Sequence, residues 1–137
     1  MVKKRKLKAT PNQKNFNIHP SEPKSTEEQH PIFSLTNMVN DKYGLNNCQQ
    51  VEKAAFADTL YKLSRVTWAQ INASGRHGIG VEVIKQESIK ASIPKNITND
   101  TNIIAFRFYG KAPMVGYRDG RVFYVIWLDR NYTLYGH

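Results

Sequence analysis

The stretch FRFYGKAPMVGYRDGRVFYVIWLD, from Phe106 to Asp129, decides the fold of this chain. Its apolar runs are interrupted twice, by Gly110-Lys111 and by Asp119-Gly120. Dipeptides of this kind between apolar runs are typical of two-residue β-hairpin turns. The stretch therefore predicts an antiparallel meander, with strands at residues 103–109, 113–118 and 121–128.

Two such turns set a register in which Arg118 faces Arg121 and Arg107 faces Met114. Because side chains alternate across a sheet, this register sorts them onto two faces. The first face is apolar, is expected to pack on helices, and holds Ile104, Phe106, Phe108, Val115, Tyr117, Val122, Tyr124, Ile126 and Leu128. The second face is expected to be basic and aromatic, and holds Ala105, Arg107, Tyr109, Met114, Gly116, Arg118, Arg121, Phe123, Trp127 and Asp129.

Upstream of the meander, a short strand is expected from Ile32 to Thr36, behind Pro31. Apolar residues at helical spacing predict helices over residues 48–65 and 67–74. Thr67 and Gln70 form the pattern of a capping box, Gly75 can end the second helix, and another strand is expected over residues 79–84. Residues 31–137 thus read as a single α+β domain: a strand, two helices, then a C-terminal antiparallel β-meander with the helices packed on one face.

The charge of the chain is strongly positive, at +9 over 137 residues. Seven of the 20 Lys and Arg residues lie in residues 1–30, which lack hydrophobic periodicity. Such a segment buries too little apolar surface to offset its ordering entropy, so it is expected to be a flexible basic N-terminal arm. A nucleic-acid contact, a nuclear-import patch and a solubilising tail are all compatible with this composition.

Several classes of protein do not fit the sequence. No run approaches the roughly 20 apolar residues that span a bilayer, so we expect no membrane contact. Cys48 is the only cysteine, which excludes an intrachain disulfide and favours a cytoplasmic location. The histidines are scattered and Gly78 and Gly80 lack the rest of a phosphate-loop motif, so we expect neither a metal nor a cofactor.

The second face suits single-stranded RNA, because guanidinium groups bind phosphates while aromatic rings such as Trp127 stack on bases. Three cations converge on that face where only two carboxylates, Asp119 and Asp129, are available, which favours a binding surface. The structural alternative is that a terminal segment covers Trp127 and Phe123, while the arginines pair with Asp119 and Asp129.

The order of elements, together with FRFYGKAPMVGYRDGRVFYVIWLDRNYTLYGH, resembles the RelE-like toxin superfamily. The resemblance implies a basic sheet face that binds messenger RNA, commonly on the ribosome. It implies in addition an acidic antitoxin that holds the protein inactive. It also implies metal-independent cleavage, in which the 2′-OH attacks the adjacent phosphate. Arg107 in AFRF and Tyr135 in LYGH match residues of the family, and His137 stands where some members place a histidine. The basic arm and the final segment depart from the family pattern.

Three functions follow for testing. The first is a toxin that acts as a metal-independent endoribonuclease on mRNA; the second is a non-catalytic RNA- or ribosome-binding protein of phage or mobile-element origin. The third is a structural or regulatory partner of another protein. The expected catalytic residues are Arg107, Tyr135 and His137, and the expected substrate-binding residues are Lys111, Arg118, Arg121 and Trp127.

Overall fold

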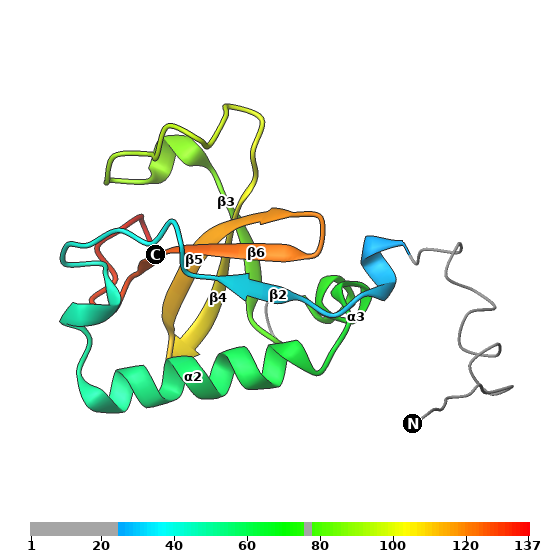
Figure 1. The fold of residues 1–137 in the computed structure, drawn as a ribbon. Helices are drawn as coiled ribbons and strands as arrows, with labels where there is room; N and C mark the ends of the chain where they lie inside the picture. The colour runs from blue at the N-terminus through cyan, green and yellow to red at the C-terminus, as the bar shows by residue number, and fades with distance from the viewer. Residues whose placement is uncertain (1–24, 76–77) are drawn as a thin grey trace, which may run out of the picture.

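The computed structural model describes residues 25–75 and 78–137. In this part of the chain, five strands form one sheet in the spatial order β2-β6-β5-β4-β3 (Figure 1). The strands are β2 (Ile32–Ser34), β3 (Val81–Ile84), β4 (Ile103–Tyr109), β5 (Ala112–Asp119) and β6 (Val122–Leu128). The helices of the same residues are α2 (Gln50–Ser64) and α3 (Trp68–Ser74), with 3-10 turns η1 (Thr26–Glu28), η2 (Leu45–Asn47) and η3 (Gln86–Ser88).

The α+β class is confirmed, as are the first strand, the helix pair and the antiparallel meander β4-β5-β6. The sheet as a whole is mixed, because β2 runs parallel to β6, with Ile32 beside Val122. The helices start at capping groups. The Glu52 carboxylate accepts the Gln49 backbone N–H at 2.7 Å, and Thr67 forms the expected capping box with Gln70.

The first hairpin closes at Gly110-Lys111 as predicted, since Tyr109 pairs with Ala112 across the turn. Gly110 has a φ of +58°, which suits the first central position of a type II′ turn. The predicted register beyond the turn is wrong. An irregularity between Arg107 and Tyr109 leaves Phe108 as an extra residue, so Arg107 lies opposite Pro113 instead of Met114.

The second hairpin closes one residue later than predicted. Asp119 pairs with Val122, so Gly120 and Arg121 form the turn. Gly120 has a φ of +63°, which again places glycine first, as a type II′ turn requires. The Asp-Gly turn of type I′ would need positive φ at Asp119 as well, whereas Asp119 is the last residue of β5.

A bulge in β6 further changes which side chains share a face. Val115 pairs with Trp127 and Gly116 with Val125, so Ile126 is an extra residue on β6. As a result, Ile126 and Trp127 point to the same side of the sheet. The predicted assignment of faces is therefore wrong for most of β5 and β6, although Phe106 and Phe108 of β4 do face the helices.

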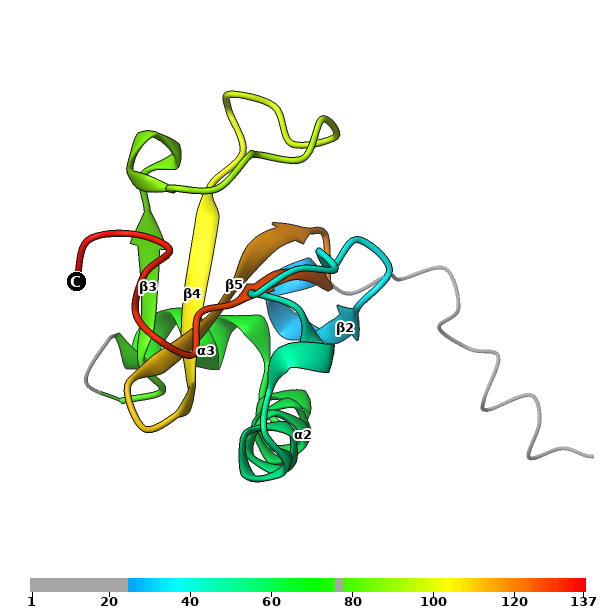
Figure 2. The ribbon, with the colours of Figure 1, turned by 90° about the vertical axis from the view of Figure 1, so that its left-hand side faces the viewer.

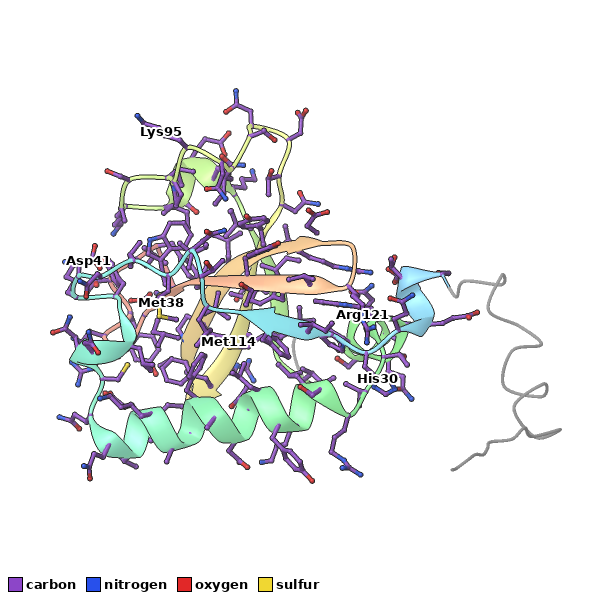
Figure 3. All side chains as sticks on the ribbon, in the orientation of Figure 1. His30, Met38, Asp41, Lys95, Met114 and Arg121 are labelled. Carbon is purple, nitrogen blue, oxygen red and sulfur yellow. The ribbon has the colours of Figure 1, made fainter. Side chains whose placement is uncertain are left out.

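Two hydrophobic cores lie on the two faces of the sheet. The helix-side core is built from α2, α3 and the facing strand residues: Phe56, Leu63, Trp68, Ile71, Phe106, Phe108, Met114, Phe123, Val125 and Leu128. Met114, labelled in Figure 3, lies between the sheet and α2. The second core is covered by loops and the C-terminal segment. Its buried residues are Tyr43, Ile84, Ile97, Ile103, Ala105, Val115, Ile126, Trp127, Leu134 and Tyr135.

Gly116 is required where β5 and β6 approach each other beside the bulge. A Cβ atom at this position would lie 1.8 Å from the Tyr124 carbonyl oxygen and 3.2 Å from the Phe123 ring. A glycine inside a strand commonly marks such a close backbone approach.

The start of the folded domain lies within the expected N-terminal arm. Residues 1–24 of that arm lie outside the described residues. From residue 25 onward the chain is ordered by contacts: η1 packs against α3, and the Glu27 carboxylate accepts a hydrogen bond from Asn72 at 2.8 Å. Residues 25–30 therefore belong to the domain. No helix in the described ranges is both long and apolar enough to cross a bilayer.

Candidate functional site

An open cleft of about 630 Å³ lies on the face of the sheet opposite the helices. Its floor comes from neighbouring strands and includes Glu82 of β3, Arg107 of β4 and Pro113 of β5. Its wall is the C-terminal segment, residues 129–137, which runs across the sheet toward β3 (Figure 2). Tyr132, Tyr135 and His137 of that segment line the cleft, and Lys111 stands at the first hairpin turn.

Arg107 is the exposed cation of the cleft floor. Gly80, with a φ of +86°, lies against it: a Cβ atom on Gly80 would meet the Arg107 Cδ, Cγ and Nε atoms at 3.2–3.4 Å. Gly80 thus leaves room for the arginine side chain to lie across the start of β3. Within residues 25–75 and 78–137, Arg107 forms no hydrogen bond or ion pair, so its donors are available to an anion.

Asp129 organises the C-terminal segment from a fully buried position. Its carboxylate accepts the backbone N–H groups of Thr133 and Leu134 at 2.8 and 3.1 Å. The same group lies 3.0 Å from Nε2 of His137. The carboxylate thereby holds both the loop and the orientation of the imidazole, as the orienting acid of a catalytic pair does.

Two tyrosines pack against His137 from different directions. The Tyr135 ring is buried and stacks on the imidazole, with ring centres 4.2 Å apart. The Tyr132 ring meets the imidazole edge-on at 5.2 Å and is 44% exposed. Tyr132 has a φ of +59°, in the left-handed region that bulky side chains rarely adopt.

The wall of the cleft is attached to three other parts of the fold. The Lys90 backbone N–H donates to the Leu134 carbonyl at 2.7 Å, and the hydroxyls of Tyr43 and Thr133 lie 3.1 Å apart. The third attachment is an ion pair between Arg130 and Glu52 of α2, at 2.7 Å. The cleft wall is consequently held by both the helix layer and the loops.

The electrostatics of this third attachment keep Glu52 charged. Burial by itself would raise the pKa of Glu52, but hydrogen bonds from Arg130 and from the Gln49 backbone bring that pKa below its usual value. The same hydrogen bond raises the pKa of Arg130. Nearby, burial and the charge of Glu52 raise the pKa of the Cys48 thiol, which disfavours the thiolate needed for a nucleophile.

The structure brings together four of the seven residues expected in the site: Arg107, Lys111, Tyr135 and His137. Arg118 lies on the helix side instead. Its guanidinium stands 4.2 Å from the Trp68 ring and 2.6 Å from the Glu27 carboxylate. Arg118 therefore anchors η1 and does not share a surface with Arg107.

The remaining two expected residues also have structural positions. Arg121 is in the hairpin turn and donates from Nε to the His30 carbonyl at 3.0 Å; both residues are labelled in Figure 3. Trp127 is fully buried in the second core, so it cannot stack on an external base. The structural alternative is right about Trp127, which packs with Leu134 and Tyr135 of the C-terminal segment. It is wrong about Phe123, which is buried on the helix side beside Trp68. Arg118 and Arg121 bind the Glu27 carboxylate and the His30 carbonyl and not Asp119 or Asp129.

Six residues that line the cleft were not predicted as site residues: Gly80, Glu82, Ala105, Pro113, Tyr132 and Gly136. Glu82 could have been found from the sequence, because it is a lone carboxylate in the apolar run GVEVI. Side chains alternate along a strand, so Glu82 points to the face opposite that of its neighbours Val81 and Val83. Nothing in the sequence indicates that Tyr132 takes a left-handed backbone conformation.

No family model, curated protein or solved structure matches this chain. In the residues that the structure describes, no three His, Cys, Asp or Glu side chains are grouped as a metal site requires. A function is therefore inferred from the chemistry of the cleft.

Proposed function

We propose that this protein is a metal-independent endoribonuclease that cleaves mRNA in the cytoplasm, as a toxin of the RelE-like type. One observation carries the proposal: the cleft gathers two cations, Arg107 and Lys111, with a His137–Asp129 pair and the Tyr135 ring. The proposed RelE-like type rests on the order of strand, helix pair and meander, which is the order that the resemblance implies.

The cations are suited to the phosphate of the substrate. Arg107 has donors without partners among the described residues, and a guanidinium can bind two phosphate oxygens at once. Lys111 adds a second positive charge from the hairpin turn. Donors that are already in place when negative charge develops on the phosphate lower the barrier without reorganisation.

The His137–Asp129 pair is suited to proton transfer. In the proposed reaction the 2′-oxygen attacks the phosphorus while the bond to the 5′-oxygen breaks. His137 accepts the proton of the 2′-OH, and the Tyr135 hydroxyl supplies a proton to the departing 5′-oxygen. The products are a 2′,3′-cyclic phosphate and a 5′-hydroxyl. Transfer of the proton from His137 through solvent to the Tyr135 oxygen then restores both side chains, so that atoms and charge balance without a metal or another reactant.

The charge of the molecule bears on its partners. A cleft with two cations and a net charge of +9 would attract an acidic protein as well as RNA. An acidic antitoxin that covers the cleft would then exclude the substrate by occupying the same cations.

The test is cleavage of single-stranded RNA by the purified full chain in the presence of EDTA, with and without ribosomes. We expect fragments that end in a cyclic phosphate, and no cleavage at a position whose 2′-OH is replaced by hydrogen. Tight RNA binding without cleavage in both settings would identify the protein as the non-catalytic RNA- or ribosome-binding alternative. Cleavage that requires a divalent ion would overturn the proposed mechanism.

A further inference from the structure

Tyr132 has a backbone conformation that its side chain does not favour. Its φ of +59° lies in the left-handed region, which costs a non-glycine residue on the order of 1 kcal/mol or more. Among the described residues, no other non-glycine residue has a positive φ. Glycine or asparagine would fit this turn more easily, so a tyrosine here calls for a reason.

The packing of Tyr132 does not supply that reason. The residue is 44% exposed, and its one aromatic contact among the described residues is the edge-on approach to His137 at 5.2 Å. By contrast, Tyr135 three residues later is buried and stacks flat on the same imidazole. A half-exposed ring contributes little to the core, whereas strained residues often occur at ligand sites.

The position of Tyr132 suggests which ligand it would contact. Its side chain lines the cleft together with Arg107 and Lys111. An exposed aromatic ring beside two cations combines the two chemistries by which proteins hold single-stranded nucleic acid, namely stacking on a base and ion pairing with a phosphate.

We infer that Tyr132 is the platform on which a nucleobase of the RNA stacks, next to the phosphate bound by Arg107 and Lys111. This inference rests on the proposed function and adds to it a binding residue that fixes the position of the substrate. Stacking of this kind accepts any base face, so Tyr132 sets the register of the strand and not a base sequence.

The test uses the full-length chain and a set of single-stranded RNAs of one sequence. Each RNA carries the fluorescent base 2-aminopurine at a different position. A 2′-deoxy sugar at the cleavage position prevents turnover. We expect strong quenching of 2-aminopurine fluorescence when the label lies next to the phosphate at the cleavage position, and not at other positions. Tyr132→Phe keeps the ring and should retain both the quenching and the affinity. Tyr132→Leu should abolish the quenching and weaken RNA binding about tenfold or more.

Two controls separate stacking from a structural role. Tyr61→Leu removes a tyrosine of α2 that is 61% exposed on the helix side, and it should leave affinity and quenching unchanged. Tyr132→Gly should lose RNA affinity as Tyr132→Leu does, while its melting temperature equals or exceeds that of the wild type. A structural role predicts instead a lower melting temperature with unchanged RNA affinity.

The outcomes distinguish this inference from the proposed function. If the wild type cleaves RNA but the Tyr132 variants bind and quench like the wild type, Tyr132 is not a platform and the proposed function stands. If Tyr132→Phe loses as much affinity as Tyr132→Leu, the hydroxyl and not the ring is the contact, and the inference fails. If the wild type binds no RNA, both fail together.

Discussion

His137 Nε2 lies 3.0 Å from a carboxylate oxygen of Asp129, and Asp129 is fully buried. Because the same carboxylate accepts two backbone N–H groups of its own loop, it serves the fold as well as the imidazole. His137 is the partly exposed member of the pair and faces the cleft. The two residues should therefore respond differently to substitution.

His137→Gln should reduce RNA cleavage by about a hundredfold or more, the usual scale for a lost general base, with little change in melting temperature. Asp129→Asn should lower both the cleavage rate and the melting temperature, because the amide leaves a backbone donor unpaired at a cost of about 1–3 kcal/mol. Thermal unfolding and single-turnover cleavage measure the two effects. Equal loss of stability in both variants would show that the pair is only structural.

Arg107→Ala should preserve the melting temperature and reduce cleavage by on the order of a hundredfold, the scale for losing a charge stabiliser. Arg107→Lys should restore only part of the activity, because an ammonium lacks the bidentate geometry.

Arg118→Ala is the matched control for Arg107, since Arg118 lies on the helix side beside Trp68 and Glu27. It should lower stability by on the order of 1–2 kcal/mol and leave cleavage by the folded fraction unchanged. If Arg118→Ala removed activity without destabilising the fold, the substrate would bind on the helix side of the sheet.

Gly116→Ala should destabilise the domain by at least about 3 kcal/mol, because the new methyl group collides with the Tyr124 carbonyl oxygen. Gly136→Ala is the comparison variant, since a Cβ atom there meets nothing within 4 Å. Denaturant unfolding of both variants measures the difference. A stable Gly116→Ala variant would mean that β5 and β6 are not held at this separation.

The stability of the domain should depend on pH through Glu52. Because the pKa of Glu52 is lowered in the folded state, its stabilising effect is complete above the ordinary Glu pKa of about 4.3. That effect is lost as the pH falls through the lower folded-state pKa.

Glu52→Gln should accordingly have a lower melting temperature than the wild type near neutral pH, and the difference should shrink in acid. Asp58→Asn breaks an exposed pair with Lys62 whose two side chains are 59% and 71% exposed, and it should change the melting temperature little at any pH. A difference between Glu52→Gln and the wild type that is constant with pH would rule out the lowered pKa as its cause.

The elements of the fold could be predicted because their signals are local. Thr67 and Gln70 mark the start of α3, and Gly110-Lys111 marks the first hairpin turn. Arg107 was also predictable, because strand alternation places it opposite the helix side. Tyr135 and His137 were expected from the family resemblance, and Lys111 from its position in the turn. The face on which Arg107 lies depends on β4 alone, so it is unaffected by the wrong register predicted for β5 and β6.

The faces of β5 and β6 could not be predicted, because two irregularities set them. The extra residues Phe108 and Ile126 follow no local pattern. Phe108 shifts the pairing of β4 with β5, and Ile126 shifts the pairing of β5 with β6. Gly116 was the single signal: a glycine between Val115 and Tyr117 in a strand marks a close approach. It indicates where the irregularity lies, but not which strand carries the additional residue.

The bulge at Ile126 has an evolutionary consequence. Because Ile126 and Trp127 point to the same side, removing Ile126 would restore regular alternation and leave Val125, Trp127 and Leu128 on their present faces. The segment that carries Asp129 and His137 would therefore leave β6 in its present direction. A lineage can gain or lose this one codon in frame and keep the cleft on the same face of the sheet.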